Sequence, residues 1–183
     1  MWTQLSYDVS VDIDMTNIEE LQLLMASLGC DDLEAVSSFL ELYLYPTTIL
    51  DRLFIRLPGD AAEASGAAAA PADEAQQRRI SSYDDNNDLV LDHLRLIKAV
   101  NFRGTWCELV LISFLLKKAP AVEQLVLVAV EEEHGASGDE LLKIIRGKVS
   151  AMQKASPDVR VTVCHPSEDR SQNPAHTRFY HEE

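Results

Sequence analysis

The stretch Val122-Glu123-Gln124-Leu125-Val126-Leu127 carries the pattern that decides the fold of this chain. An apolar residue is followed by an acid, and further apolar residues stand three and five positions after the first. Four such sets begin at residues 18, 50, 91 and 122. A repeat of this period is typical of stacked repeat proteins, in which each unit buries its apolar face against its neighbours. The sets are Ile18-Glu19-Leu21-Leu23, Leu50-Asp51-Leu53-Ile55, Leu91-Asp92-Leu94-Leu96 and Val122-Glu123-Leu125-Leu127.

The last two apolar residues of each set are spaced as in a short strand with one buried face. Successive parallel strands need a long connection, which is usually a helix. Helices are predicted over 31–43, from the capping box Thr105-Trp106-Cys107-Glu108 onward, and from Ser137 onward. Alternating apolar residues predict further strands over 9–15 and 159–163. Apolar side chains expected to point inward from the third helix are Leu141, Ile144, Ile145, Val149 and Met152.

This order predicts an α/β fold: a leucine-rich-repeat-like solenoid with a parallel sheet on its concave side and helices outside. An ordinary open α/β domain without repeats is the alternative. In either case, the core between sheet and helices should include Leu94, Leu96, Leu125 and Leu127.

Composition limits the function classes. The chain has 183 residues, 46% of them hydrophobic, and a formal net charge of −14. Such acidity argues against binding to nucleic acid or to an anionic membrane surface. The three cysteines stand far apart without a CxxC pair, as reduced thiols of an intracellular protein do. We therefore expect a cytoplasmic or nuclear protein without a membrane-spanning segment.

The segment 59–88 differs from its surroundings because it is rich in alanine and acids and has few larger apolar residues. Such a segment cannot bury enough surface to offset the entropy of ordering, so we predict a disordered acidic, alanine-rich insertion. The region 165–183 is polar and irregular and is predicted to be a solvated tail.

No motif for catalysis is found. The sequence contains no glycine-rich phosphate loop, no HExxH and no GxSxG. Ser137 is accounted for as a helix cap, and the paired acids Asp84-Asp85 lie within the predicted insertion. We expect a protein that is not an enzyme and that has no catalytic residues, cofactor or metal.

The second half of the chain resembles the FBD domain of plant F-box/leucine-rich-repeat proteins. The first half, over 1–58, resembles the last leucine-rich repeats that precede that domain, and 89–164 is the FBD-like segment that continues the stack. The FBD resemblance rests on Leu91-Asp92-His93-Leu94, Asn101-Phe102-Arg103-Gly104, Leu115-Leu116-Lys117-Lys118-Ala119-Pro120, Val122-Glu123-Gln124-Leu125 and Ala155-Ser156-Pro157-Asp158-Val159.

The resemblance implies the substrate-recognition part of a cullin-type ubiquitin ligase receptor, in which the repeats capture the protein to be degraded. The implied partner is a protein, such as a ubiquitination substrate. This sequence has no F-box before the repeats. We expect a fragment, a truncated gene model or a form that lost the F-box, and direct binding to the ligase adaptor is not carried over.

Strand residues that alternate with the buried ones should line the concave face of such a stack. Arginine and aromatic residues are favoured as anchors of binding surfaces. The alternatives are that Phe54 and Ile97 pack under the insertion or tail, or that the protein is a structural remnant that only associates with a longer relative. The candidate protein-binding residues are Arg52, Phe54, Arg56, His93, Arg95 and Ile97, and the concave face should also include Glu20, Gln22, Gln124, Val126 and Val128.

Overall fold

The computed structural model describes residues 17–44, 49–59, 89–130 and 138–175. These residues form an α/β fold around an open sheet of five parallel strands in the order β1-β2-β3-β4-β5. The predicted strand over 9–15 and, apart from Gly59, the predicted insertion over 59–88 lie outside the described residues. The elements are β1 (Glu20–Leu24), α1 (Cys30–Leu44), β2 (Arg52–Arg56), β3 (Leu96–Phe102), α3 (Trp106–Lys118), β4 (Gln124–Ala129), α4 (Gly138–Ser150), β5 (Arg160–Cys164) and the 3₁₀ helix η2 (Pro166–Glu168).

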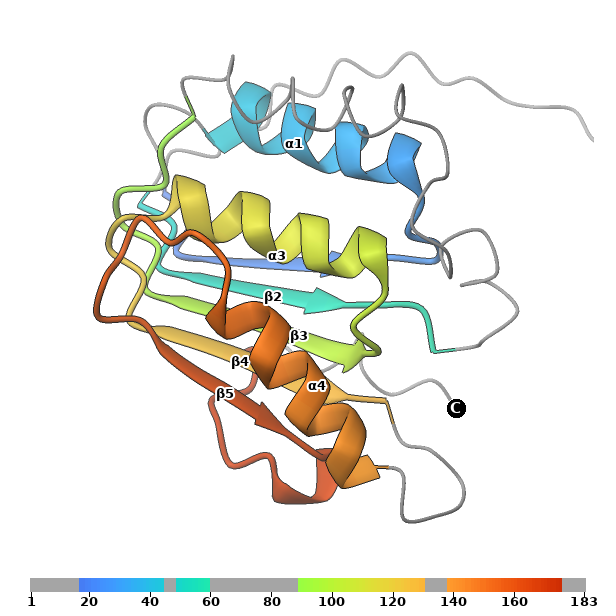
Figure 1. The fold of residues 1–183 in the computed structure, drawn as a ribbon. Coiled ribbons are helices and arrows are strands. Elements are labelled where there is room, and N and C mark those ends of the chain that lie inside the picture. The colour runs from blue at the N-terminus through green and yellow to red at the C-terminus, as the bar shows by residue number, and fades with distance from the viewer. Residues whose placement is uncertain (1–16, 45–48, 60–88, 131–137, 176–183) are drawn as a thin grey trace, which may run out of the picture.

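The helices α1, α3 and α4 all lie on one face of the sheet (Figure 1). The crossover from one parallel strand to the next is right-handed in nearly all proteins. Because the strands follow one another across the sheet in chain order, crossovers of one hand place every helix on the same side. The predicted α/β class, with a parallel sheet and helices beside it, is confirmed.

The main core lies between the sheet and the helices. Its central strand residues alternate along each strand, as the repeat pattern requires. Burial of each large apolar side chain stabilises the fold by about 1.5–3 kcal/mol. Residues of this core with 0% exposed surface include Leu53, Ile55, Ile97, Leu125 and Leu127 from the strands and Leu40, Leu115, Leu116 and Val149 from the helices.

The turn from β3 into α3 has two residues with left-handed backbone conformation, Asn101 (φ 64°) and Gly104 (φ 72°). A Cβ atom on Gly104 would lie 2.8 Å from Ile145 of α4, so only glycine fits there. The predicted capping box follows: an Oε atom of Glu108 accepts the backbone N–H of Thr105 at 2.9 Å. The capping box fixes where α3 begins.

The predicted register of β3 is wrong. The N–H groups of Arg95 and Leu96 donate to the carbonyl of Asp51, just as those of Asp51 and Arg52 donate to Glu19. Leu94 is therefore the counterpart of Leu50, whereas the sequence pattern placed Leu91 there. A shift of three residues is odd, so it exchanges the faces of the strand.

Ile97 consequently packs in the main core, and Leu96 lies on the opposite face of the sheet. Leu94 is buried in the main core as predicted. The source of the error is the turn at Asp92-His93, where the N–H of Leu94 donates to the carbonyl of Leu91 at 3.2 Å. That turn contributes an apolar-acid pair that mimics the start of a repeat.

One inward position predicted for α4 is also wrong. Ile144 is 49% exposed, whereas Leu142 is buried beside Ile145 and Val149. The buried residues are spaced three and four apart, which places them on one stripe of the helix.

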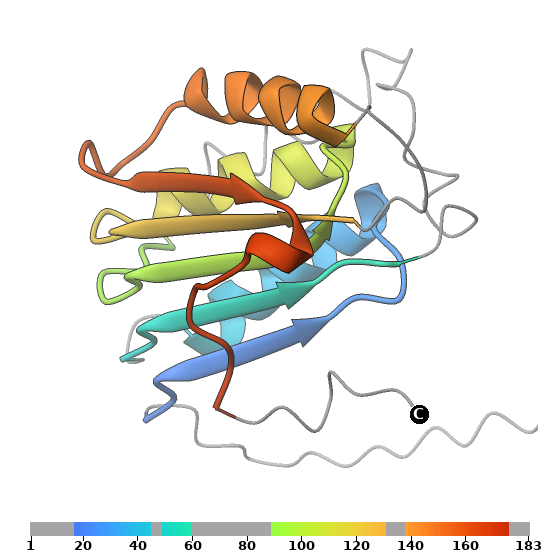
Figure 2. The ribbon, with the colours of Figure 1, turned by 90° about the horizontal axis from the view of Figure 1, so that it is seen from below.

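The prediction of a solvated tail from residue 165 is wrong for the part that the structure describes. Residues 165–175 form η2 and then cross the sheet on the face opposite α1, α3 and α4 (Figure 2). Polar composition did not exclude ordered packing here, because hydrogen bonds and an ion pair hold this segment on the sheet.

Truncation of core residues tests the corrected register. We expect Leu125→Ala and Ile97→Ala each to lower the free energy of unfolding by about 2–5 kcal/mol, because both leave a cavity in the main core. Arg95→Ala should cost less than about 1 kcal/mol, since exposed ion pairs contribute little. Urea denaturation with unchanged m-values measures these differences. An Ile97→Ala cost as small as that of Arg95→Ala would restore the register first predicted.

Candidate functional site: the open sheet face

The sheet face opposite the helices, here called the open face, is built from three rows of strand residues. Each row runs across all five strands in the observed register. Lys98 stands on the central strand and in the central row. The rows are Glu20-Arg52-Leu96-Gln124-Arg160, Gln22-Phe54-Lys98-Val126-Thr162 and Leu24-Arg56-Val100-Val128-Cys164.

The middle of the open face is apolar and buried. Phe54 is only 1% exposed and packs with Leu96, Val126, Val128 and Cys164 in a cluster separate from the main core. A bare sheet face would leave such side chains in water. The chain covers this face with residues 165–175, here called the strap, which run from the end of β5 toward β1 (Figure 2).

Lys98 ties the strap to the sheet. Its ammonium donates to the Asp169 carboxylate at 2.6 Å, the Gln172 carbonyl at 3.1 Å and the Asn173 side-chain oxygen at 2.9 Å. An ammonium has three N–H donors, so each has a partner. Lys98 is 1% exposed, and a charge so deeply buried is tolerated only when it is paired in this way.

Asp169 also shapes the strap itself. Its carboxylate accepts the backbone N–H of Ser171 at 3.0 Å and the Ser171 hydroxyl at 2.5 Å, which closes an Asx-type turn. Burial raises the pKa of Asp169, but the hydrogen bonds from Lys98 and Ser171 outweigh burial and hold the pKa below its ordinary value. The ionised carboxylate is therefore the form that holds the strap.

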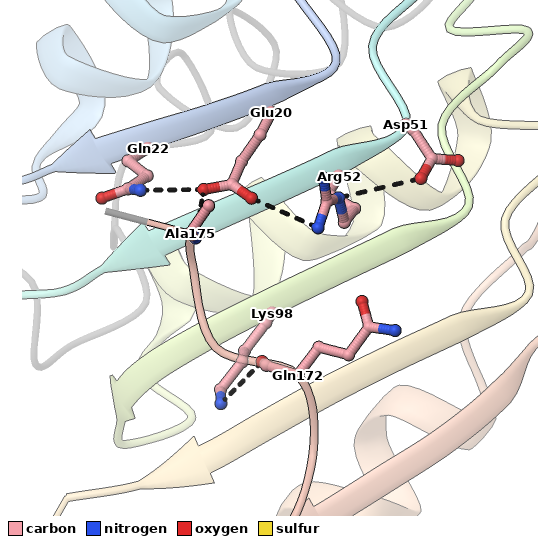
Figure 3. A network of polar contacts seen from close by, with 7 residues as sticks. All are labelled: Glu20, Gln22, Asp51, Arg52, Lys98, Gln172 and Ala175. Carbon is pink, nitrogen blue, oxygen red and sulfur yellow. Dashed lines mark hydrogen bonds and ion pairs between the residues drawn. The ribbon is translucent and has the colours of Figure 1, made fainter. Parts of the chain in front are cut away.

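A second contact holds the far end of the strap on β1. Glu20 accepts the backbone N–H of Ala175 at 2.8 Å and the side-chain amide of Gln22 at 2.9 Å (Figure 3). Its other oxygen lies 3.5 Å from the Arg52 guanidinium without forming a hydrogen bond. Arg52 in turn lies 3.8 Å from Asp51. The Glu20 end is thus less completely hydrogen-bonded than the Lys98 end.

Two other buried groups have shifted pKa values. Burial raises the pKa of the Cys164 thiol, and Asp169 and Glu168 raise it further, so Cys164 is not the thiolate needed for nucleophilic chemistry. Burial also raises the pKa of Glu108, against the hydrogen bonds it accepts from the backbone of Thr105 and Arg103. Those bonds give Glu108 a structural role in starting α3.

The six predicted binding residues lie in three different places: on the open face, in the main core and at the rim of the sheet. Arg52, Phe54 and Arg56 lie on the open face as predicted, but Phe54 is 1% exposed and is therefore buried rather than available at the surface. The prediction that Ile97 lies on this face is wrong, because it belongs to the main core. The others lie at the rim.

His93 is exposed in the turn before β3. Arg95 precedes β3 and is 66% exposed, with Asp51 at 3.6 Å and Glu123 at 4.0 Å from its Nε atom. Both residues therefore belong to the edge of the sheet where the strands begin. The strap is held elsewhere, on Lys98 and Glu20.

Sequence reasoning missed Lys98, Asp169 and the strap. Lys98 has a sequence signal, because it interrupts the apolar run from Leu96 to Val100. Its partners lie more than 70 positions away along the chain, so no local pattern indicates them.

Comparison with protein-family models, curated proteins and solved structures finds no match for this chain. In the described residues, none of the helices combines the length and apolar character needed to cross a bilayer. The site's own geometry is therefore the basis for a functional proposal.

Removal of the Asp169 charge tests the hold on the strap. We expect Asp169→Asn to speed tryptic cleavage after the exposed Arg170 by about tenfold or more, because charge-assisted hydrogen bonds contribute about 1.5–3 kcal/mol. Cleavage reports the population of detached strap when the strap closes faster than it is cut. Cleavage after Lys154 is the internal reference, and Glu168→Gln is the matched control for loss of one strap carboxylate. Equal rates for both variants would contradict the role of Asp169.

The lowered pKa of Asp169 predicts a dependence of stability on pH. A carboxyl that binds protons less readily when folded contributes its full stability above its ordinary value of 3.8 and loses it as pH falls through the lower folded value. The stability difference between the natural chain and Asp169→Asn should be constant at higher pH and shrink below about pH 4. Urea unfolding at a series of pH values measures it. A constant difference down to the acid limit of folding would refute the shift.

Proposed function

We propose that this protein is a non-catalytic protein-binding scaffold, similar to the substrate-recognition part of an F-box ubiquitin ligase receptor. In this proposal the β–α units are leucine-rich-repeat-like, the segment 89–164 is FBD-like, and the open face is the concave binding surface. The protein works in the cytoplasm or nucleus and holds a protein partner, such as a ubiquitination substrate. It uses no cofactor.

The observation that carries the proposal is that the open face already binds an extended polypeptide. The Lys98 ammonium donates to the backbone carbonyl of Gln172, and the Glu20 carboxylate accepts the backbone N–H of Ala175. These two contacts recognise main-chain groups that every peptide has. The Lys98 contact to Asp169 adds recognition of an acidic side chain.

The rim of the face supports the same partner chemistry. Arg52 and Arg56 flank Phe54 on β2, and Arg95 lies directly before β3. Arginine can pair with a carboxylate through two parallel hydrogen bonds, and aromatic side chains anchor apolar residues of a partner. Arg52 and Arg95 already lie near carboxylates of the protein itself, so a carboxylate of the partner would replace these ion pairs. We infer that the partner presents an acidic segment with an apolar residue.

A second candidate function is assembly with a longer relative through the β1 end of the stack. Large apolar side chains are exposed there, namely Leu24 (49%) on β1, Leu42 (72%) on α1 and Ile49 (41%) before β2. A repeat stack whose terminal unit exposes apolar residues tends to associate. Sedimentation velocity separates the candidates, because a stable monomer favours the scaffold and obligate association favours assembly.

Affinity capture from plant extract tests the scaffold. We expect the double variant Arg52→Ala, Arg56→Ala to capture specific partners in amounts lower by about tenfold or more. Arginines that act as anchors of an interface contribute about 2 kcal/mol or more. The matched control is Lys143→Ala with Lys148→Ala, which removes two charges from exposed positions on α4. Quantitative mass spectrometry compares the captured proteins.

Both double variants must first show the thermal unfolding of the natural chain. If the β2 variant and the α4 variant capture the same proteins in the same amounts, the open face is not the binding surface.

A further inference from the structure

The strap contacts the sheet as a bound peptide does. No strap residue belongs to the main core, and the apolar cluster of the open face is made of strand residues alone. Most strap side chains are exposed, whereas Asp169 and Ser171 are half-buried and Pro174 is buried. The strap is therefore an addition to a fold whose main core is complete without it.

The polar contacts that hold the strap are non-covalent and therefore reversible. Among the described residues, the strap is held on the sheet by the Lys98 cluster, with Asp169, Gln172 and Asn173, and by the bond from Ala175 to Glu20. The Glu20 end has buried atoms without hydrogen-bond partners among the described residues, on Glu20, Gln22 and Arg52. Between described residues, detachment from that end breaks the Ala175–Glu20 hydrogen bond before the Lys98 cluster is reached.

Detachment uncovers a surface with a defined chemistry. The ammonium of Lys98 would stand in the middle of an apolar patch formed by Phe54, Leu96, Val126 and Val128. An uncompensated ammonium among apolar groups is costly, so this surface strongly favours a carboxylate. A second extended segment with a carboxylate and a small apolar residue would satisfy the same groups.

We propose that the strap is an intramolecular substitute for the partner, and that a partner peptide binds by placing its own Asp or Glu carboxylate on Lys98 in place of Asp169. This inference rests on the proposed function and adds the partner's key side chain and the competition for it. A tethered segment acts at an effective concentration of the order of millimolar. The strap thus lowers the apparent affinity for a partner by the fraction of time that it occupies the face.

The strap sequence itself supplies a probe, so the test needs no identified partner. A fluorescent peptide with the sequence of residues 165–175 is titrated into the full chain, and anisotropy reports binding. In the natural chain the built-in strap should block the peptide. In the full-length Asp169→Ala variant the strap is weakened, and we expect the peptide to bind at least tenfold more tightly than to the natural chain.

Lys98 must be the receptor for the peptide carboxylate. Asp169→Ala combined with Lys98→Met should lose the gained affinity, and so should the pairing of Asp169→Ala protein with a peptide whose aspartate is replaced by asparagine. The second arm changes no further residue of the protein, so it remains decisive if Lys98→Met does not fold. Far-UV circular dichroism and thermal unfolding check the folding of each variant.

Equal peptide binding by the natural chain and Asp169→Ala, no binding to either, or equal binding of the aspartate and asparagine peptides would overturn the inference. These outcomes are distinct from failure of the scaffold. Capture of partners that depends on Arg52 and Arg56, together with failure of the strap peptide, would leave the proposed function in place and remove only the competition with the strap.

Discussion

The handedness of the strand-to-strand crossover is the constraint on which the rest of the structure depends. Parallel strands that follow one another in chain order, joined by crossovers of one hand, place all helices on one face of the sheet. None of the α-helices of the described residues then covers the opposite face. Because that face carries Phe54 and other apolar residues at its centre, it needs a cover, and the strap provides one.

The way in which the strap is held matters as much as its presence. An apolar residue in place of Lys98 would bury surface without the cost of desolvating a charge. Lys98 instead requires three polar partners in set positions, and the strap supplies all of them. A buried ion pair can contribute specificity of placement more than net stability. We propose that another carboxylate can take the place of Asp169 on Lys98. The proposed recognition of an acidic partner and the competition with the strap follow from that chemistry.

The two faces of the sheet differed in how readily sequence reasoning could describe them. The main core was predictable, because its residues follow from alternation in the strands and from the helix stripes, and Leu125 and Leu127 lie where expected. The prediction from the repeat pattern was wrong at β3. The apolar-acid pair at the turn Asp92-His93 placed the start of this repeat three residues too early, which assigned Leu96 and Ile97 to the wrong faces of the sheet. On the open face, Arg52 and Arg56 were placed correctly, but Phe54 is buried, and a segment that composition described as a solvated tail crosses this face.

The sequence by itself determined the α/β class, the parallel sheet, the capping box at Thr105 and most of the core, because each depends on residues close together along the chain. Only the tertiary structure decided the register of β3, the burial of Phe54 and the partners of Lys98. Those features depend on contacts between segments far apart in sequence, such as Lys98 with Asp169 and Glu20 with Ala175. No local periodicity encodes such contacts. They arise because the sheet brings Lys98 to the centre of a face that the last residues of the described chain must cross.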